Sequence, residues 1–382
     1  MRMISILIFI GIVVFGWSLS SDAINIQKQV GAGADCEGCV VFPLVSDILC
    51  ELPEPICPRI MAADWSNVDR FYGTTTANCV LSVDRGDTWS NCPANPSATS
   101  VYFSYAVTMN GTILASGNDN GGATFRIRRS TDQATSWSTV YDGTPTDGLA
   151  VPTNGRFRCA RNVQLCIYYS RNAVNNQIWW LISIDDGVTW VFDNFVDVNS
   201  TQYYETAYSD NLEVGIGFGG LSLGGGGGGI TNTALLWDGV SFTYSANWPT
   251  TTGGMCNWAF VMPDLTKRMI CHDGSSGTIY TMRDENGIVA KTFSLPDSAS
   301  DNGVPQVGLA YSLVSNWIAV LRNDTAVRAA IWISLDNGST FTKLRQMSNG
   351  MGTGGGSIMK GLDNCMYFSL DTGPNGTVGR VC

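Results

Sequence analysis

This sequence is poor in charge and almost without histidine. Asp, Glu, Lys and Arg make up 14% of its 382 residues, and His272 is the single histidine. One histidine gives no basis for a Ser-His-Asp triad or a metal site. The formal net charge of −10, with no basic cluster, disfavours nucleic acid and anionic membrane surfaces as partners. We therefore expect no nucleic-acid partner, no metal and no cofactor.

Apolar runs long enough to cross a membrane are also missing. Ile4–Trp17 is an apolar run of 14 residues, whereas a membrane-spanning helix needs about 20. The run follows Arg2 and precedes small residues up to Ala23, which is typical of a secretory signal peptide. The prediction is a signal peptide over residues 1–23, with an uncleaved signal anchor as the alternative, and no membrane span after its removal.

Cysteine, by contrast, is abundant and even in number. The chain has 12 cysteines and five N-x-[ST] sequons, a combination that fits an oxidising, secretory compartment. We therefore expect an extracellular, disulfide-bonded glycoprotein. The sequons lie at Asn110, Asn199, Asn323, Asn337 and Asn375.

Glycine is abundant too, with 43 residues, and a short turn-like motif recurs along the chain. The octapeptide Ser183–Trp190 reads S-I-D-D-G-V-T-W, and close copies occur at Ser82–Trp89 and Ser334–Phe341. Degenerate copies fill the gaps, so that the motif aspartates are spaced by 48, 53, 53, 46 and 52 residues. A period near 50 residues, with several short strand-like runs per unit, indicates an all-β propeller whose units are four-stranded blades.

The motif S-x-D-x-G-x-T-[WF] resembles the Asp-box, or bacterial neuraminidase repeat, of sialidase-like propellers, over residues 59–344 or beyond. The resemblance implies that the boxes lie on the rim, away from the ligand face. The Asp carboxylate can accept backbone N–H groups in the turn between the third and fourth strands, Gly allows φ > 0, and the aromatic ring packs between blades. The residues expected in this structural role are Asp84, Trp89, Asp132, Trp137, Asp185, Trp190, Asp238, Phe242, Asp284, Asp336 and Phe341.

The number of blades depends on the C-terminal segment. Six boxes suggest six blades, but Ser357–Leu362, Cys365–Leu370 and Thr377–Cys382 read as three strands of a further blade. Its missing outer strand is expected from Ala23–Val30, which would close the ring by pairing the two chain ends. We therefore favour seven blades over six, with a closing strand and a Cys-rich cap over residues 24–58 and the propeller over residues 59–382.

The spacing of the cysteines about the predicted turns suggests which of them form disulfides. Cysteines placed evenly about a predicted turn face each other across an antiparallel hairpin and come close enough to bond. The pairs so placed are Cys79–Cys92, Cys159–Cys166, Cys256–Cys271 and Cys365–Cys382. The remaining four cysteines are expected to pair within the cap, where the sequence leaves the connectivity open and the nested pairs are favoured. The nested pairs are Cys36–Cys57 and Cys39–Cys50.

Catalytic candidates come only from the family resemblance. It implies three arginines that clamp a carboxylate, an Asp acid/base and a Tyr nucleophile activated by a Glu. Arg59 matches the first arginine, but the Pro that usually follows that motif is absent, and Tyr204 and Glu205 lie where the family places its Glu. The next strand, Glu213–Phe218, lacks the usual arginine, and no acid/base residue stands out. Other arginines, such as Arg126 and Arg158, could face the axis or the solvent.

Aromatic residues favour a binding function. Tyr203 and Trp258 fall on predicted inner strands, where rings can stack on sugars. The leading hypothesis is a secreted propeller that binds a glycan or glycoprotein at its axial face without turnover. The alternatives are a sialidase-like glycoside hydrolase of the exo-sialidase type and a structural or assembly propeller. Converging arginines with a Tyr–Glu pair would favour the enzyme, and an aromatic, neutral mouth would favour the binder.

Overall fold

We describe the protein from a computed structural model of the full chain. The chain divides into two units, Met1–Val45 and Ser46–Cys382, and every described residue belongs to the second. The structure describes residues 46–50, 56–58, 60–75, 78–97, 101–119, 124–143, 156–160, 163–172, 177–197, 202–208, 217–224, 230–237, 242–245, 255–261, 267–272, 279–284, 286–297, 318–323, 328–347, 356–363, 365–371 and 376–382.

The described residues form seven antiparallel sheets, six with four strands and one with three. In each sheet, strands that are consecutive in the sequence pair with one another, as short apolar runs joined by tight turns should do. The first three sheets contain β2 (Ile60–Ala63), β3 (Phe71–Thr74), β4 (Cys79–Ser82) and β5 (Ser90–Asn91); β6 (Val101–Val107), β7 (Ile113–Asp119), β8 (Thr124–Ser130) and β9 (Ser138–Asp142); and β10 (Arg156–Cys159), β11 (Cys166–Asn172), β12 (Gln177–Ser183) and β13 (Val191–Asp197).

The remaining sheets follow the same order. They contain β14 (Gln202–Tyr208), β15 (Gly217–Gly224), β16 (Ile230–Trp237) and β17 (Phe242–Ser245); β18 (Met255–Val261), β19 (Lys267–His272), β20 (Ile279–Arg283) and β21 (Val289–Ser294); β22 (Ile318–Asn323), β23 (Ala329–Ser334) and β24 (Thr342–Gln346); and β25 (Gly356–Lys360), β26 (Met366–Asp371), β27 (Gly376–Val381) and β1 (Ser46–Cys50). Gly308–Val314, a run of strand length that precedes β22 in the sequence, lies outside the described residues.

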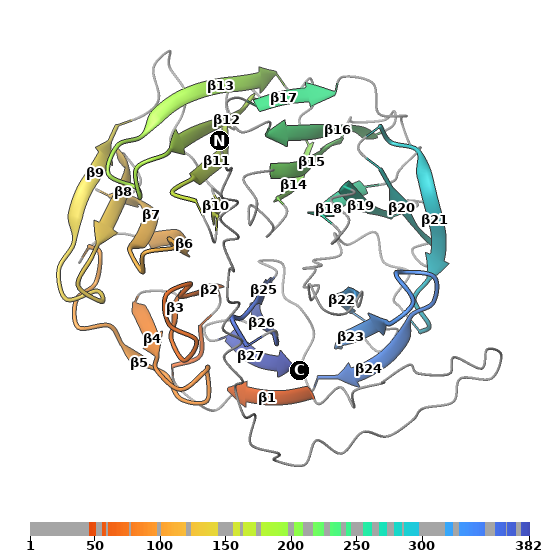
Figure 1. Ribbon diagram of the computed structural model, residues 1–382, viewed down its shortest axis with the longest axis horizontal. Helices are drawn as coiled ribbons and strands as arrows, with labels where there is room; N and C mark the ends of the chain where they lie inside the picture. Colours follow the sequence, from red (N-terminus) through yellow and green to blue (C-terminus); the bar gives the residue numbers. More distant parts are fainter. Residues whose placement is uncertain are drawn as a thin grey trace, which may run out of the picture. The chain divides into compact units, whose positions relative to one another are not determined.

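Within Ser46–Cys382 the sheets follow one another in a circle with their first strands on the inside (Figure 1). Neighbouring innermost strands contact each other, as β2 does with β6 and β25, β6 with β10, and β14 with β18. Strand direction alternates within a sheet, so the start of the first strand and the turn between the third and fourth strands lie at opposite ends. We call these the entry end and the box end.

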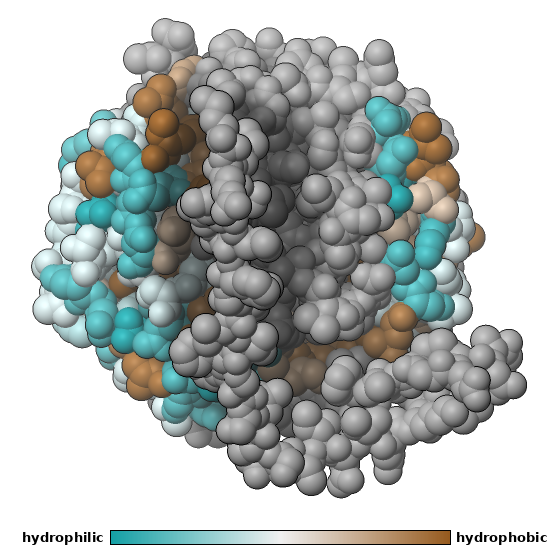
Figure 2. All heavy atoms as spheres, in the orientation of Figure 1, coloured by the Kyte–Doolittle hydropathy of each residue, from teal (hydrophilic) through white to brown (hydrophobic). Residues whose placement is uncertain are grey.

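The core lies between neighbouring sheets. The third strand β23 is buried along its whole length, whereas the outer strand β24 is mostly exposed or half-buried. Each cluster of buried apolar residues combines two successive sheets: for example, Ala106 and Phe125 of the second sheet pack with Tyr168 and Trp179 of the third. The outermost strands form the rim, where Figure 2 shows hydrophilic and hydrophobic residues side by side.

The last sheet takes its fourth strand from the N-terminal side, as predicted, but from a different segment. β1 pairs antiparallel with β27, so that Ser46 faces Val381 and Ile48 faces Gly379. Both edges of β27 are thus occupied, by β26 and β1. The prediction that Ala23–Val30 forms this strand is wrong for β27, and that segment lies outside the described residues. Leu49 of β1 packs with Trp89 and Val378 in the cluster between the last and first sheets, which holds β1 in place.

Three disulfides cross-link the strands of hairpins in the described part of the chain. They join Cys79 to Cys92, Cys159 to Cys166 and Cys365 to Cys382, which are pairs that hairpin symmetry predicts. Cys256 stands opposite Cys271 in the β18–β19 register, and both Cys271 and Cys57 are disulfide-bonded. Cys36 and Cys39 of the expected cap lie outside the described residues. Every regular element in the described ranges is a strand, and these ranges hold no helix that could cross a membrane.

Candidate functional site

The box turns lie between the third and fourth strands, and their aspartates are fully engaged. Asp185 accepts a hydrogen bond from the Ser183 hydroxyl at 2.8 Å, and from the backbone N–H and hydroxyl of Thr189 at 2.9 and 2.6 Å. The serine hydroxyl in turn accepts the backbone N–H of Gly187 at 2.9 Å. The same set of bonds recurs around Asp84, Asp132 and Asp336. The repeated aspartate therefore closes the turn.

These bonds stabilise the charged form of the carboxylates. Burial acts to raise the pKa of Asp185, but hydrogen bonds from Thr189 and Ser183 outweigh it and lower that pKa below its ordinary value. The pKa values of Asp84 and Asp336 are lowered for the same reason. Asp132 is the clearest case, because hydrogen bonds from Ser136 and Ser130 lower its pKa to about 2.

The fifth position of each turn has a left-handed backbone. Gly187 has φ of +78°, and a Cβ there would lie 2.6 Å from the Leu114 side chain of the preceding sheet. The degenerate second box carries Ala134 at this position, with φ of +63° and its methyl group fully buried. Glycine is therefore required by both conformation and space in the third sheet, and the second sheet accommodates the methyl group.

The box aromatics pack against the preceding sheet. Trp190 lies in the cluster shared by the second and third sheets, and Phe341 in the cluster shared by the fifth and sixth. Trp137 packs on the cluster between the first and second sheets and donates its indole N–H to the Ala94 carbonyl at 3.0 Å. Trp89 packs between the last and first sheets. Each ring therefore joins its own sheet to the one before it.

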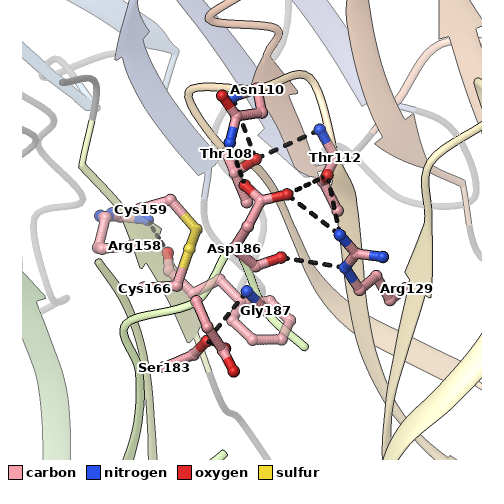
Figure 3. The surroundings of a disulfide bond; sticks show 12 residues. Thr108, Asn110, Thr112, Arg129, Arg158, Cys159, Cys166, Ser183, Asp186 and Gly187 are labelled. Atoms are coloured by element: carbon pink, nitrogen blue, oxygen red, sulfur yellow. Dashed lines mark hydrogen bonds and ion pairs between the residues drawn. A yellow bond between two sulfur atoms is a disulfide. The ribbon is translucent and has the colours of Figure 1, made fainter. Parts of the chain in front are cut away.

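The most elaborate junction lies beside the third box (Figure 3). Asp186 accepts a hydrogen bond from the Thr112 hydroxyl at 2.5 Å and from the Asn110 amide at 3.2 Å. Arg129 binds the same residue twice, from Nη2 to the carboxylate at 3.1 Å and from Nε to the backbone carbonyl at 3.0 Å. Asp186 is 8% exposed, so this ion pair is sheltered from water, and it links the third sheet to the second.

Other box turns are held from the preceding sheet in simpler ways. Lys291 of β21 donates to the Asn337 carbonyl at 2.7 Å and to the Ser339 hydroxyl at 2.8 Å in the sixth sheet's box. Arg380 of β27 approaches Asp87 of the first box at 3.9 Å. The box at Asp284, whose sequence matches the motif least, still forms the turn, since Asp284 accepts hydrogen bonds from the backbone N–H groups of Asn286 and Ile288. Asp238 lies outside the described residues. The polar groups at the box end are thus engaged in structural contacts.

The candidate site residues lie on innermost strands. Tyr203, Tyr204 and Glu205 belong to β14, and Trp258 belongs to β18. These two strands are the first strands of neighbouring sheets and contact each other. The fold therefore brings the aromatic candidates and the carboxylate onto adjacent strands of the inner circle. Arg59 lies outside the described residues, so its place relative to this group is not described.

Arginines outside the box turns also have protein partners. Arg126, which the sequence could not place, pairs with Asp142 at 3.1 Å, and Arg158 donates to the Phe157 carbonyl at 3.0 Å. Sequence reasoning missed Arg322, which is the last residue but one of the strand β22, is 1% exposed and donates to the Tyr280 hydroxyl. Burial lowers the pKa of Arg322 to about 10. Its position near the end of an apolar strand gave no signal of this burial.

Comparison with solved structures identifies the architecture. The chain is similar to YCF48 bound to D1 peptide, at 15% identity and a TM-score of 0.55 over 88% of this chain and 96% of that chain. It is similar to a streptogramin B lyase, at 11% identity and a TM-score of 0.55 over 89% and 97%. It is also similar to an oligogalacturonate lyase from Vibrio parahaemolyticus, at 8% identity and a TM-score of 0.56 over 89% and 96%. The fold is β-propeller-like.

The sequence comparisons add no family to this result. No protein-family model matches the chain, and no curated protein matches it. Identities this low establish a shared fold and carry no activity with them. The function of the propeller has to be argued from its own residues.

Proposed function

We propose that this protein is a secreted propeller that binds an extracellular glycan or glycoprotein at the entry end of its inner circle. The observation that carries the proposal is the contact between β14 and β18, which brings Tyr203, Tyr204 and Trp258 onto neighbouring innermost strands together with Glu205. Aromatic rings stack on the apolar faces of sugars, and a carboxylate accepts hydrogen bonds from sugar hydroxyls. Both chemistries are what a saccharide site needs.

The difference in polar contacts between the two ends supports the same proposal. At the box end, the carboxylates of Asp84, Asp132, Asp185, Asp186 and Asp336 already accept hydrogen bonds within the protein. A ligand there would have to displace those bonds. Ligand binding at the entry end would leave the junctions between sheets intact.

The proposal includes the finer features expected from the sequence. We infer that the recurring turns are Asp-boxes, that each of the seven sheets is one blade, and that a Cys-rich cap precedes the ring. Disulfides in three hairpins fit an oxidising compartment and so support secretion. The pairing of β1 with β27 supports a count of seven, since it completes the last sheet without using the first.

The test is a glycan-array screen of the full chain, paired with a fluorogenic sialoside assay. We expect binding to a defined saccharide and no turnover. Trp258→Ala and Glu205→Ala should each weaken that binding by about tenfold or more, the usual effect of losing a stacked ring or a charged hydrogen bond. Asp185→Ala, at the opposite end, is the matched control and should bind as the wild type does.

Two results would overturn the proposal. A chain that stays folded and binds no saccharide on the array would remove the glycan-binding function. Turnover of the sialoside that disappears in both Arg59→Ala and Glu205→Ala would show a sialidase-like hydrolase instead.

A further inference from the structure

One sequon forms part of the junction beside the third box. Asn110, Gly111 and Thr112 lie in the short turn between β6 and β7. Strand direction alternates within a sheet, so this turn lies at the box end. The Asn110 amide donates to the Asp186 carboxylate at 3.2 Å, and the Thr112 hydroxyl donates to the same carboxylate at 2.5 Å (Figure 3). The sequon of the second sheet therefore contacts the box turn of the third.

The two sequon side chains differ in their exposure to water. Asn110 is exposed, whereas Thr112 is buried. The amide nitrogen of an asparagine carries two hydrogens, and the bond to Asp186 uses one of them. A sugar can replace the other hydrogen without loss of that bond. The folded turn therefore accommodates a glycan on the Asn110 amide nitrogen.

A second sequon at the box end offers a comparison. Asn337, in the box turn of the sixth sheet, starts the sequon that ends at Ser339. Asn337 is half-buried, and its side-chain oxygen is enclosed by protein. Glycosylated asparagines need space for a bulky group at the surface. Of these two sequons, the one at Asn110 meets that need better. The side chains of the other three sequon asparagines lie outside what the structure describes.

The third box turn also presents apolar side chains to water. Ile184 is 72% exposed, more than any other large apolar residue that the structure describes. Val188, in the same turn, and Val191, which follows it, are exposed too. Asp186, the partner of Asn110, lies between Ile184 and Val188 in the sequence. Exposed apolar side chains that gather in one place mark a surface that another group covers.

We propose that Asn110 carries an N-linked glycan and that its first sugars cover the apolar side chains of the third box turn. This inference rests on the secretion that the proposed function includes. In the transfer, the Asn110 amide nitrogen forms a bond to the anomeric carbon of an oligosaccharide carried on a lipid diphosphate. The bond from that carbon to the diphosphate oxygen breaks, the lipid diphosphate leaves with the electron pair, and the amide releases one proton.

The transfer has to precede the folding of this junction. A sequon requires the hydroxyl of its third residue, and in the folded protein the Thr112 hydroxyl is buried and bound to Asp186. The chain therefore receives the glycan before its second and third sheets pack together. The glycan then projects from the box end and leaves the entry end open for the saccharide that we propose as ligand.

The first measurement is peptide mass mapping of the full chain recovered from the medium of a eukaryotic secretory host. We expect the peptide that contains Asn110 to carry an oligosaccharide. Asn110→Gln should remove one glycan from the intact mass. Asn337→Gln is the matched control and should change the intact mass only by the substitution. A bare Asn110, or a glycan on Asn337 in its place, would overturn the assignment, and mapping of the wild type needs no variant to fold.

The second measurement tests the cover with a hydrophobic dye, anilinonaphthalene sulfonate. Protein from the periplasm of a bacterial host without this transfer should give higher dye fluorescence than the glycosylated protein, because its third box turn is uncovered. Ile184→Ser combined with Val188→Ser should remove that difference. Leu335→Ser is the matched control, since Leu335 is exposed at the same position of the sixth box, and the difference should persist. A difference that persists in the double variant would show that the glycan covers another surface.

The outcomes separate this inference from the function it rests on. If the protein in the medium carries glycans on other sequons and Asn110 is bare, the site is wrong although secretion stands. If the chain stays inside the cells and carries no glycan, the secretory part of the proposed function falls and takes this inference with it.

Discussion

The box end and the entry end of the same sheets are built in different ways. At the box end, four turns repeat one set of hydrogen bonds around Asp84, Asp132, Asp185 and Asp336. Nearer the entry end, the described parts of the innermost strands show no such repeat: β6, β14 and β18 each carry a bulge, at different sequences. The repeated element is the box turn, which closes the third and fourth strands of a sheet. The ligand site that we propose lies at the end without the repeat.

The box turns also differ among themselves in the ion pair that their fourth residue forms. Asp186 forms a sheltered ion pair with Arg129, and their side chains are 11% and 20% exposed. Arg85, at the same position of the first box, pairs with Asp69 between β2 and β3 of its own sheet, and those side chains are 44% and 50% exposed. Water screens the second pair far more than the first. The same motif position therefore contributes unequally around the ring.

The largest expected effect comes from breaking the sheltered pair. Asp186→Ala should lower the free energy of unfolding by about 3 kcal/mol, because it leaves Arg129 partly buried without its carboxylate and frees Thr112 and Asn110. Arg85→Ala is the matched control and should cost less than about 1 kcal/mol. Urea titration of both variants measures the difference. Equal losses would show that burial does not set the contribution of this position.

The next largest loss of stability is expected at the fifth position of the box turns, which is Gly187 in the third box and Ala134 in the second. Gly187→Ala should destabilise the protein by about 2–3 kcal/mol, since the new Cβ meets Leu114 and the backbone stays at positive φ. Ala134→Gly in the second box should change stability by less than about 1 kcal/mol, because relief of the left-handed backbone offsets loss of a buried methyl group. Thermal melts of the two variants check this. A neutral Gly187→Ala would mean that the turn can shift away from Leu114.

Removing a box carboxylate should have a smaller effect and leave binding unchanged. Asp185→Ala takes the acceptor from the Thr189 N–H and hydroxyl, which are exposed to water. We expect a loss of about 1–2 kcal/mol. Affinity for any saccharide should stay the same in the folded fraction, as measured by titration. Lost binding with an unchanged melting temperature would contradict the separation of the two ends.

The smallest expected effect is a loss of stability at acidic pH. The pKa values of Asp84, Asp132, Asp185 and Asp336 are lower in the folded protein than their ordinary value of 3.8. A lowered folded-state pKa adds stability above the unfolded value and removes it as the pH falls through the folded value. The melting temperature should therefore fall between about pH 4 and pH 2. Asp132→Asn should flatten this profile slightly, and a profile that is identical to the wild type would show that the box hydrogen bonds do not favour the charged form.

The sequence alone was sufficient for local features. The octapeptide places Ser183, Asp185 and Thr189 at spacings that close one turn, and the cysteines of one hairpin flank its turn evenly. Such features depend on residues close together in the chain, so their pattern is visible without the fold. Strand positions followed from the same short-range patterns, as for the expected Cys365–Leu370 and the observed β26 (Met366–Asp371).

Only the tertiary structure decided which distant residues meet. Ala23–Val30 alternates like a strand in the sequence, but β1 (Ser46–Cys50) completes the last sheet, and its Leu49 packs in the cluster beside Trp89 and Val378. Asp186 pairs with Arg129, which lies 57 residues away in the sequence, and no local sequence pattern predicts this pair. Bulges and the contact between β14 and β18 likewise depend on register and on the closing of the circle. These are set by packing over the whole chain, where many pairings are locally equivalent and burial selects one.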